Sequence, residues 1–556
     1  MPPRNRTPRP KPAARPASSA AGKGGARAPA GAGPGALPSH VELTLGLDEA
    51  QDPAALRQAA ARTLKRPEAE LPELTLVRKS IDARRHNVRF KLEVALGAPP
   101  PKELGTPLPV EARALVGGAP VVIVGDGPAG LFCAYELARQ GIASVVLDRG
   151  KPVQPRRRDL ALLNREGLVD NDSNYCFGEG GAGTYSDGKL YTRTGEKGAI
   201  RDVLETLALH GAPEVILTDA RPHIGSNKLP KVITALRERL EGLGVQFRFG
   251  ARVVRLDLDP ARHIRGVQLA GGETVPCSAL VLATGHSARD IYTMLDEQGV
   301  ALVPKPFALG VRIEHPQPMI NQQQYGRSAG HPALPASYYR VAETVDGRGV
   351  FSFCMCPGGF IVPAATEPGA QVVNGMSLSR RDSPFANSGL VVAVEPSDWE
   401  RAGFKGPMGG VAFQRVIEEA AFQAGGGGLK APATRASDFR VGRSSSTVPK
   451  GSYQPGFCAT DITPVLDASG VPLAARLRTA LGVFEKRMPG YGGNEAVLVG
   501  VESRTSSPVR IPRDPVTLQS PDVAGLYPCG EGGGFAGGIV SAALDGMRVA
   551  RVIAGG

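Results

Sequence analysis

Three glycines, Gly125, Gly127 and Gly130, have the spacing of a phosphate-binding loop, and an apolar run at residues 121–124 comes directly before them. In such a loop the first glycine permits a tight turn, the second lets the backbone approach a pyrophosphate, and the third lets a helix pack against a strand. The start of the following helix exposes N–H groups and the positive end of its dipole, which favour an anion. The pattern predicts a dinucleotide site.

An acidic residue stands at the end of the next predicted strand, residues 144–147. This residue, Asp148, lies 18 positions after Gly130. A carboxylate at this place accepts hydrogen bonds from ribose hydroxyls, whereas the following Arg149 leaves open a contact with the 2′-phosphate of NADP. A glycine turn in an unrelated α/β fold is a further alternative. The loop alone does not separate FAD from NAD(P).

A second cluster of glycines, residues 529–539, precedes a predicted helix that runs to about residue 553. The N-terminal end of such a helix stabilises negative charge on a reduced isoalloxazine ring through its dipole. A flexible hinge is the alternative, but a hinge would not need an amphipathic helix directly behind it. An early phosphate loop paired with a late glycine-rich helix start is typical of flavoproteins, and it favours FAD.

A third glycine-rich segment, residues 178–190, carries Ser186, Asp187 and Lys189 beside a loop whose backbone N–H groups can converge. These side chains would supply polar contacts near a redox ring. Lys189 would stabilise the negative charge of a reduced flavin, because it would stand where that charge develops. An ordinary solvated loop lysine is the alternative interpretation.

Two cysteines, Cys354 and Cys356, form a C-x-C pair ahead of Pro357-Gly358-Gly359. Such a pair can form a labile disulfide, but the spacing differs from the C-x-x-C of redox motifs. Because the residues around the pair are aromatic or apolar, we favour a buried strand in which both cysteines act as small hydrophobes. The pair lacks the second cysteine or histidine pair that a zinc site needs, so we expect no metal.

Other residues with chemical potential are dispersed. His223, His286 and His315 are interpreted as structural histidines with satisfied hydrogen bonds. Arg504 either faces a substrate or forms a surface ion pair. Since the sequence contains no nucleophile elbow and no Ser-His-Asp pattern, its catalytic residues are left unassigned.

Four segments together resemble the bacterial FAD-dependent dehydrogenases of poorly characterised activity, within the glutathione-reductase-like flavoprotein superfamily. The first is VVIVGDGPAGLFCAYELARQG with VVLDRG, and the second is FGEGGAGTYSDGKL. The third is SFCMCPGGFIVPA with VNGMSLSRRDSPFANS, and the fourth is GLYPCGEGGGFAGGIVSAALDG. The aspartate at 148 replaces a more frequent glutamate, and Asp126 occupies a loop position that is usually small or apolar.

The resemblance implies a set of FAD contacts. The pyrophosphate would lie against Gly125, Gly127, Pro128, Ala129 and Gly130, and the adenosine end against Asp148, Arg149 and Val253. The flavin would lie beside Gly180, Gly181, Ser186, Asp187, Gly188 and Lys189. Thr284 and Gly285 would face the phosphates, and the ribityl chain and pyrimidine would be closed in by Gly530, Glu531, Gly537, Gly538 and Ile539.

The order of predicted elements indicates an α/β chain with a Rossmann-like FAD-binding domain, an inserted α+β substrate domain and a small N-terminal α+β domain. At 556 residues the chain is too long for one hydrophobic core. We expect a disordered basic tail at 1–38, the small domain at 39–97, a Pro-rich linker at 98–118, and FAD-binding parts at 119–299 and 495–556 around an insertion at 300–494.

Charge and cysteine content place few further limits. The formal charge is +12, and seven of those charges lie in residues 1–38, which contain no acid. Such a tail is most simply a solvated extension, although a nucleic-acid tether is an alternative. The seven scattered cysteines argue against a disulfide framework, and neither a secretory signal nor a membrane span is visible, so we expect a cytoplasmic protein.

These observations predict an FAD-dependent oxidoreductase that transfers hydride between FAD and a small organic substrate. A second GxGxxG with strand context is not visible, so NAD(P)H would act as a transient donor. Two rival hypotheses are a nucleic-acid-associated modifying enzyme that uses the basic tail, and a non-catalytic FAD-binding scaffold or sensor. The oligomeric state is left open.

Overall fold

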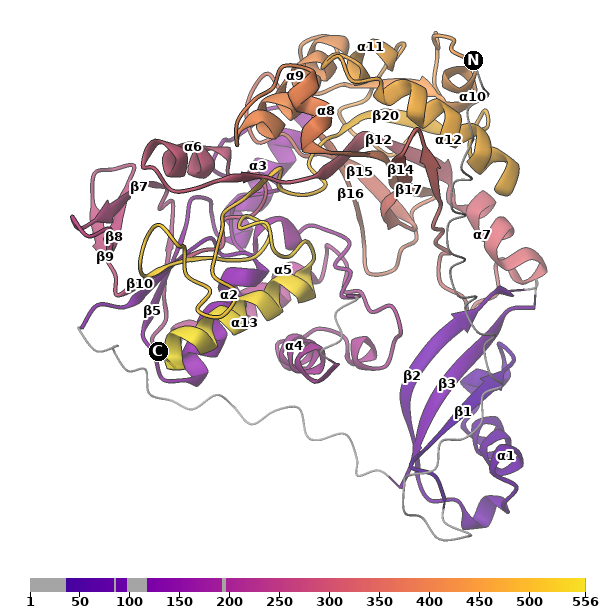
Figure 1. Ribbon diagram of the computed structural model, residues 1–556. Coiled ribbons are helices and arrows are strands. Elements are labelled where there is room, and N and C mark those ends of the chain that lie inside the picture. The colour runs from indigo at the N-terminus through magenta and orange to yellow at the C-terminus, as the bar shows by residue number, and fades with distance from the viewer. Residues whose placement is uncertain (1–36, 85–86, 98–117, 193–196, 556) are drawn as a thin grey trace, which may run out of the picture.

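The computed structural model describes residues 37–84, 87–97, 118–192 and 197–555. Almost all of the expected tail at 1–38 and the expected linker at 98–118 lies outside these residues. Within them, the chain forms two large sheets with their helices and a smaller unit built from its first residues, which Figure 1 places at the lower right.

A five-stranded parallel sheet forms the first large unit. All four neighbouring pairs in it are parallel, as expected when helices connect the strands. In spatial order the strands are β22 (Leu526–Pro528), β10 (Ala279–Leu282), β4 (Val121–Val124), β5 (Ser144–Asp148) and β6 (Gln246–Phe249). This arrangement confirms the predicted Rossmann-like α/β fold. The C-terminal segment supplies an edge strand, so the domain is closed by residues far apart in the sequence.

Helices and short antiparallel strands complete this unit. The helices are α2 (Pro128–Arg139), α3 (Val153–Glu166), α4 (Lys197–Leu209), α5 (Leu229–Glu241), α6 (Arg289–Glu297) and α13 (Ile539–Gly555). A three-stranded sheet consists of β7 (Val253–Leu258), β8 (Ile264–Leu269) and β9 (Thr274–Pro276).

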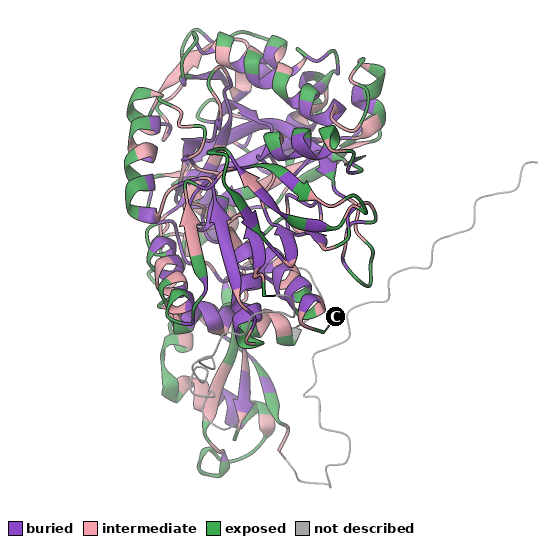
Figure 2. Cartoon of the chain, turned by 90° about the vertical axis from the view of Figure 1, so that its left-hand side faces the viewer, coloured by how far each residue is buried: buried purple, intermediate pink, exposed green. Residues whose placement is uncertain are grey.

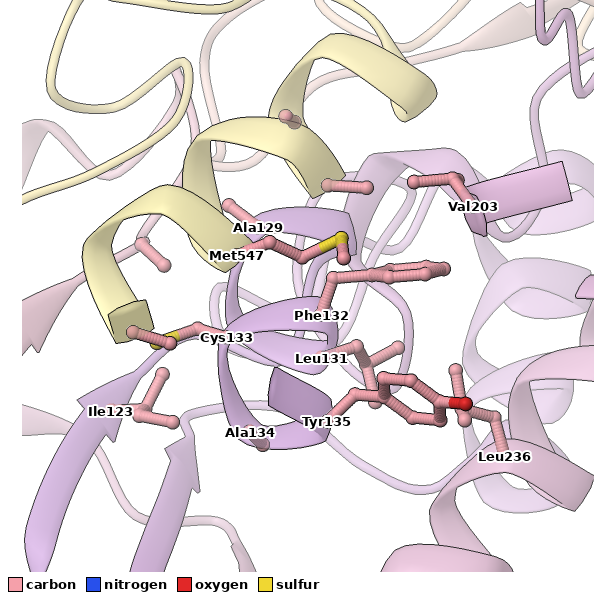
Figure 3. Close-up of a cluster of buried hydrophobic side chains, with 14 of the residues drawn as sticks. Ile123, Ala129, Leu131, Phe132, Cys133, Ala134, Tyr135, Val203, Leu236 and Met547 are labelled. Carbon is pink, nitrogen blue, oxygen red and sulfur yellow. The ribbon is translucent and has the colours of Figure 1, made fainter. Parts of the chain in front are cut away.

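Helix α2 carries the phosphate-binding loop and is buried along nearly its whole length, because α5 and α13 pack on it as well as the sheet. In Figure 3 the side chains of Met547 from α13 and Leu236 from α5 approach α2 from different sides. The contact with α13 needs a bare glycine at Gly546, since a Cβ there would lie 2.0 Å from the carbonyl oxygen of Ala129. This packing fixes the C-terminal glycine cluster beside the loop.

The second large unit is a seven-stranded sheet in which every neighbouring pair except the last is antiparallel. Its strands in order are β13 (Ala342–Val345), β14 (Arg348–Cys356), β17 (Phe385–Val394), β12 (Phe307–Pro316), β20 (Val497–Glu502), β18 (Ala431–Arg435) and β19 (Phe457–Ala459). The boundary expected at residue 494 must therefore move beyond Glu502. The prediction missed this because β20 pairs only with strands distant in the sequence.

Six helices and two antiparallel strand pairs accompany the seven-stranded sheet. The helices are α7 (Gln317–Tyr325), α8 (Pro396–Arg401), α9 (Gly409–Ala424), α10 (Ala436–Arg440), α11 (Thr463–Leu466) and α12 (Leu473–Arg487). The strand pairs are β15 (Gly359–Pro363) with β16 (Val373–Ser377), and β11 (Val303–Pro304) with β21 (Val509–Arg510). The core of this unit includes the chain's single tryptophan, Trp399, which stacks on Phe307.

The N-terminal unit is a three-stranded antiparallel sheet with one helix. Its strands lie in the order β1 (His40–Leu45), β3 (Arg89–Leu96) and β2 (Leu74–Asp82), and α1 (Pro53–Leu64) covers one face. Asp52 caps α1 by accepting a hydrogen bond from the backbone of Ala54, 2.9 Å away. Backbone hydrogen bonds join Lys79 to residues 218 and 220, so this unit contacts the FAD-binding part.

Burial follows this division into units. Figure 2 shows buried strands at the centre of each sheet, with exposed residues on the outer faces of the helices. In the parallel sheet, β4, β5, β10 and β22 are buried at every residue, as expected for strands covered on both faces. Among the described residues, none of the helices has the length and apolar character needed to cross a membrane.

Candidate functional site

A cavity of about 380 Å³ opens at the carboxyl ends of the parallel strands, between the two large units. The loops after β4 and β10 line one side, and Phe353 and Cys354 of β14 line another. Ligands of open parallel sheets bind at this edge, because the helix N-termini and connecting loops meet there. The cavity therefore coincides with the site that the glycine loop predicts.

Most of the predicted contact residues line this cavity. They are Gly125, Gly127, Pro128, Ala129, Asp148, Gly181, Ser186, Asp187, Gly188, Lys189, Thr284, Gly285, Glu531, Gly537, Gly538 and Ile539. Arg149 and Val253 line a smaller adjoining pocket, which shares Gly125, Asp148, Phe177 and Thr284 with the larger one. Residues from six separated segments thus lie around the two adjoining pockets.

Three predicted contact residues, Gly130, Gly180 and Gly530, line neither pocket. A Cβ on Gly130 would lie 1.9 Å from the carbonyl oxygen of Gly125, so this glycine serves close helix packing. Gly180 adopts a left-handed φ of 75° against Thr184, and the Gly530 backbone donates a hydrogen bond to Asp545, 2.8 Å away. These glycines shape the loops from behind rather than face the cavity.

The turn at Gly125 requires glycine for two reasons. Its φ is 103°, in the region that side chains rarely adopt, and a Cβ there would lie 2.4 Å from the carbonyl oxygen of Ala283. This close approach brings the loop after β4 against the loop after β10. The result is a cradle of bare backbone at the mouth of the sheet.

The carboxylate of Asp148 forms hydrogen bonds within the protein. Its carboxylate accepts hydrogen bonds from the backbone of Asp126 at 3.0 Å, Gly150 at 2.8 Å and Gly178 at 3.0 Å. A carboxylate has about four acceptor positions, so three of them join loops and about one faces the cavity. The predicted ribose contact is thus accompanied by a role in positioning the phosphate loop.

We expect Asp148→Asn to weaken FAD binding about tenfold and to destabilise the protein by about 1–3 kcal/mol, because an amide nitrogen would face one of three N–H donors. The affinity is measured by fluorescence titration of the apoprotein, and the stability by thermal unfolding. Asp257→Asn, at an exposed position, is the matched control. Equal FAD affinity of Asp148→Asn and the wild type would contradict this role.

Arg149 does not have the free guanidinium that a 2′-phosphate would need. Its Nε lies 2.7 Å from Asp172, its Nη1 lies 2.9 Å from Asp290, and the group stacks on Phe177 at 4.5 Å from the ring centre. The alternative of an NADP phosphate contact is therefore disfavoured. Arg149 instead forms one wall of the smaller pocket, where Val253 forms another.

Asp126, which departs from the usual loop pattern, is fully buried. Burial raises its pKa well above the ordinary value, and the nearby carboxylates of Asp148 and Glu179 raise it further. These influences favour the protonated, neutral form of Asp126. A neutral side chain here agrees with a position that usually holds a small or apolar residue.

Lys189 is not a solvated loop lysine. Its Nζ lies 3.5 Å from each sulfur of Cys354 and Cys356 and 3.8 Å from Asp187, and the side chain is one-third exposed. Burial alone would lower its pKa, but the two sulfurs and the carboxylate raise it overall. Asp187 is held in turn by Ser377 and Arg381, so the ammonium belongs to a fixed polar group at the cavity.

Cys354 and Cys356 differ in their exposure to solvent. Cys356 is buried, as expected, but Cys354 is exposed and lines the cavity. The interpretation of both as buried hydrophobes is therefore wrong for Cys354. The pairing of β14 with β17 shifts register between Phe353 and Cys356, and Cys354 has a φ of 44° in this bulge. Neither feature is visible in the sequence, because the bulge arises from pairing with a distant strand.

Comparison with known proteins adds a relative from Clostridium beijerinckii, described as an uncharacterized protein. It is 39% identical over 537 residues, which cover 92% of this chain and 97% of the relative. The chain belongs to the same family. Within it, residues 118–166 match an FAD binding domain, residues 228–373 match a family described as FAD dependent oxidoreductase, and residues 306–505 match the C-terminal domain of FAD-dependent proteins. Residues 38–96 match a domain of unknown function.

The protein is an FAD-dependent oxidoreductase. The solved structures that resemble it include the flavin-dependent brominase Bmp2, at 13% identity over 79% of this chain and 80% of that one, with a TM-score of 0.35. A geranylgeranyl bacteriochlorophyll reductase-like protein from Thermoplasma acidophilum is 11% identical over 78% of each chain, with a TM-score of 0.33.

The residues of the cavity fit FAD. The cradle at Gly125 and Gly127 has no side chains to displace, as a pyrophosphate requires. The hydroxyl of Thr284 lines the cavity and is buried without a hydrogen-bond partner among the described residues, so it is free to donate to a phosphate oxygen. Bound FAD supplies the capacity to take up or release hydride, and the protein orients it.

Glu531 of the FAD-dependent oxidoreductase lines the same cavity. Burial raises its pKa to about 8, and Lys305 opposes this rise. A carboxyl group with this pKa changes its protonation near neutral pH. Glu531 is thus able to hold a proton beside the predicted ribityl and pyrimidine end of FAD.

His286 and Ser287 line the cavity and were not assigned to it from the sequence. Burial lowers the pKa of His286 to about 4, and the neighbouring Arg504 lowers it further, so the imidazole is neutral at pH 7. His286 directly follows the predicted contacts Thr284 and Gly285, and this adjacency was the available signal. His223 and His315 bond to backbone carbonyl groups, as expected of structural histidines.

Arg504 neither lines the cavity nor forms a surface ion pair. It is buried and binds Glu418 at 2.9 Å, and Glu418 also binds Arg289 at 2.8 Å. Both sequence-based alternatives for Arg504 are therefore wrong. Among the described residues, no group of three or more potential ligand side chains is placed to hold a metal ion.

Proposed function

We propose that this FAD-dependent oxidoreductase is a dehydrogenase or reductase that transfers hydride between FAD and a small organic substrate. The resemblance to bacterial FAD-dependent dehydrogenases supports this class. The observation that carries the proposal is the composition of the cavity wall. One end is made of the glycine loops of the parallel sheet, and the other is closed by Lys189, Phe353 and Cys354.

This division suggests where the substrate lies. The bare-backbone cradle suits the pyrophosphate, which leaves the flavin ring directed toward the seven-stranded sheet. A substrate held beneath β14 would then contact the ring. The exposed side chain of Tyr191, with an exposed fraction of 59%, lies on the rim of the same cavity and is available to a substrate or donor.

The partners follow from the same geometry. NAD(P)H is the proposed transient donor, and it would dock without a phosphate contact from Arg149, whose guanidinium is engaged by two acids. We place the protein in the cytoplasm, because its cysteines are unpaired in the described residues and odd in number in the whole chain.

Anaerobic reduction of the bound flavin tests the proposal. The holoprotein is mixed with NADH, NADPH or members of a metabolite library, and bleaching of the oxidised flavin absorption is followed. We expect at least one pyridine nucleotide or metabolite to bleach the flavin, and a second compound to restore its colour under anaerobic conditions. A flavin that only oxygen re-oxidises, across the whole library, would contradict a dehydrogenase or reductase.

A further inference from the structure

One wall of the cavity carries a pair of thiols that hydride transfer to a small organic substrate does not require. The sulfurs of Cys354 and Cys356 share the Lys189 ammonium, with both Nζ–Sγ distances at 3.5 Å. Cys354 is exposed and lines the cavity, while Cys356 is fully buried behind it. One accessible sulfur and one shielded sulfur therefore stand at the end of the cavity where the flavin ring is proposed to lie.

The backbone presents Cys354 to the cavity. The register of β14 shifts between Phe353 and Cys356, and the φ of Cys354 is 44°. A left-handed conformation is uncommon for a residue with a side chain, and bulges next to active sites often redirect one side chain. Arg312 fixes the bulge by donating a hydrogen bond of 2.6 Å to the carbonyl oxygen of Cys354. The bulge leaves Cys354 exposed and Cys356 buried, while both sulfurs stay within reach of Lys189.

Hydrogen bonding and charge favour a thiolate at Cys354. The Cys356 thiol is the largest influence that lowers the pKa of Cys354, and Lys189 and Arg312 add to it. Burial opposes this effect. The acids that face the pair are Asp187, Glu502 and Glu531, and the first two are each bound to an arginine. The net direction is a pKa of Cys354 below the ordinary value, with the proton retained on Cys356.

We propose that Cys354 and Cys356 form a redox-active dithiol that exchanges electrons with FAD. In the oxidative direction the Cys354 thiolate and the Cys356 thiol together lose one proton and two electrons, and one S–S bond forms. The two electrons released reduce FAD, which is the oxidant that the established activity supplies. The reverse direction uses two electrons and one proton to break the S–S bond, and it restores the Cys354 thiolate and the Cys356 thiol. The substrate class that the exposed Cys354 would then serve is a thiol or a disulfide, by exchange at its sulfur.

This inference deepens the proposed function and rests on it for the electron acceptor. The thiol pair differs from a passive pair in two measurable ways. The lowered pKa predicts that Cys354 holds a larger fraction of thiolate than an ordinary cysteine, with a pKa of about 8.5, does at the same pH. A disulfide between near neighbours is also strained, so it is reduced readily.

Alkylation tests the thiolate without reference to flavin turnover. Holoprotein is treated with iodoacetamide between pH 5 and 9, and the Cys354 peptide is quantified by mass spectrometry. We expect Cys354 to react rapidly at pH 6, and Lys189→Met to slow this reaction about tenfold, since loss of the cation raises the pKa by about one unit. Lys228→Met, at an exposed position, should leave the rate unchanged. Cys354 that reacts at pH 6 no faster than an ordinary thiol overturns the proposal.

Reductive titration tests the electron exchange. Anaerobic dithionite should deliver four electrons per FAD to the oxidised wild type, two for the flavin and two for the disulfide, but only two to Cys354→Ser or Cys356→Ser. Before reduction, the peptide containing both cysteines should be lighter than its reduced form by the mass of two hydrogen atoms. Two electrons per FAD in all three proteins, with no lighter peptide, overturns the proposal.

The two proposals fail in different ways. If the metabolite screen finds no reductant but the wild type still takes up four electrons, the dithiol stands and hydride transfer to an organic substrate is wrong. If the screen finds a reductant and the thiol measurements fail, hydride transfer to an organic substrate stands and the dithiol proposal is wrong. Each serine variant replaces one sulfur atom with oxygen, so we expect both variants to fold. A variant that does not fold would be recognised by its loss of bound FAD.

Discussion

Replacing Gly127 with aspartate is expected to lower the affinity for FAD by at least about 100-fold while leaving the apoprotein folded. Gly127 is the N-cap of α2 with an ordinary φ of −77°, and a Cβ there would meet only the Cα of Gly181, 4.0 Å away. Aspartate is a favoured N-cap residue, so the fold tolerates it. Its carboxylate would face the pyrophosphate, and two unit charges 4 Å apart repel by about 4 kcal/mol near a protein surface.

Two measurements separate binding from folding in this variant. Fluorescence titration gives the FAD affinity, and thermal unfolding of the apoprotein gives a Tm that should stay within about 2 °C of the wild type. Asparagine has about the same size as aspartate but carries no charge. Gly127→Asn should therefore bind FAD at least about tenfold more tightly than Gly127→Asp. Gly428→Asp, at an exposed glycine with open surroundings, controls for added charge. Unchanged FAD affinity in Gly127→Asp would refute the placement of the pyrophosphate.

The second large effect is expected from Arg312→Met, which should destabilise the protein by about 3–5 kcal/mol. Arg312 is fully buried and binds Glu502, itself 3% exposed, at 2.8 Å. It also donates hydrogen bonds to Asn374 at 3.0 Å and Asn387 at 2.9 Å. Methionine fills similar volume but leaves the carboxylate buried without a counter-charge. We expect the Tm of the seven-stranded unit to decrease by about 10 °C.

The pH dependence of this variant identifies the cause. Burial raises the folded-state pKa of Glu502 from 4.5 to about 7, although Arg312 opposes the rise. Protonation of Glu502 therefore contributes stability that is complete below pH 4.5 and is lost as the pH rises through 7. Without Arg312 the pKa rises further, so the defect should be smallest near pH 5 and should grow toward pH 8.

A control and a contrary outcome complete this test. Arg415→Met removes an ion pair between Arg415 and Glu419, and both of these side chains are more than half exposed. This change should lower the free energy of unfolding by less than about 1 kcal/mol. A Tm decrease in Arg312→Met that is equal at pH 5 and pH 8 would show that lost packing, rather than an unpaired carboxylate, is responsible.

The sequence predicted the parts of the site that depend on local pattern. Gly125, Gly127 and Gly130 occur in one short segment whose spacing reflects the geometry of a single strand–turn–helix unit. The late glycine cluster was assigned to the same site because an amphipathic helix follows it directly, and an early phosphate loop paired with a late glycine-rich helix start is typical of flavoproteins. Fold class and cofactor therefore followed from short-range constraints.

The remaining features depend on contacts between distant segments. Arg149 seemed free for a phosphate, because nothing in the sequence shows that Asp172 and Asp290 meet its guanidinium. Cys354 was taken as buried because its neighbours are apolar, but the bulge against β17 turns it outward. The side of the cavity formed by the seven-stranded sheet is for this reason the part that the sequence predicts least.

A crystal structure of the protein with bound FAD tests the account most directly. We predict the pyrophosphate against Gly125 and Gly127, the adenine between Arg149 and Val253, and the isoalloxazine ring within contact distance of Lys189 and Cys354. A flavin ring that lies in the pocket of Arg149 and Val253, or FAD bound outside the cavity, would contradict the placement of the reaction beneath β14.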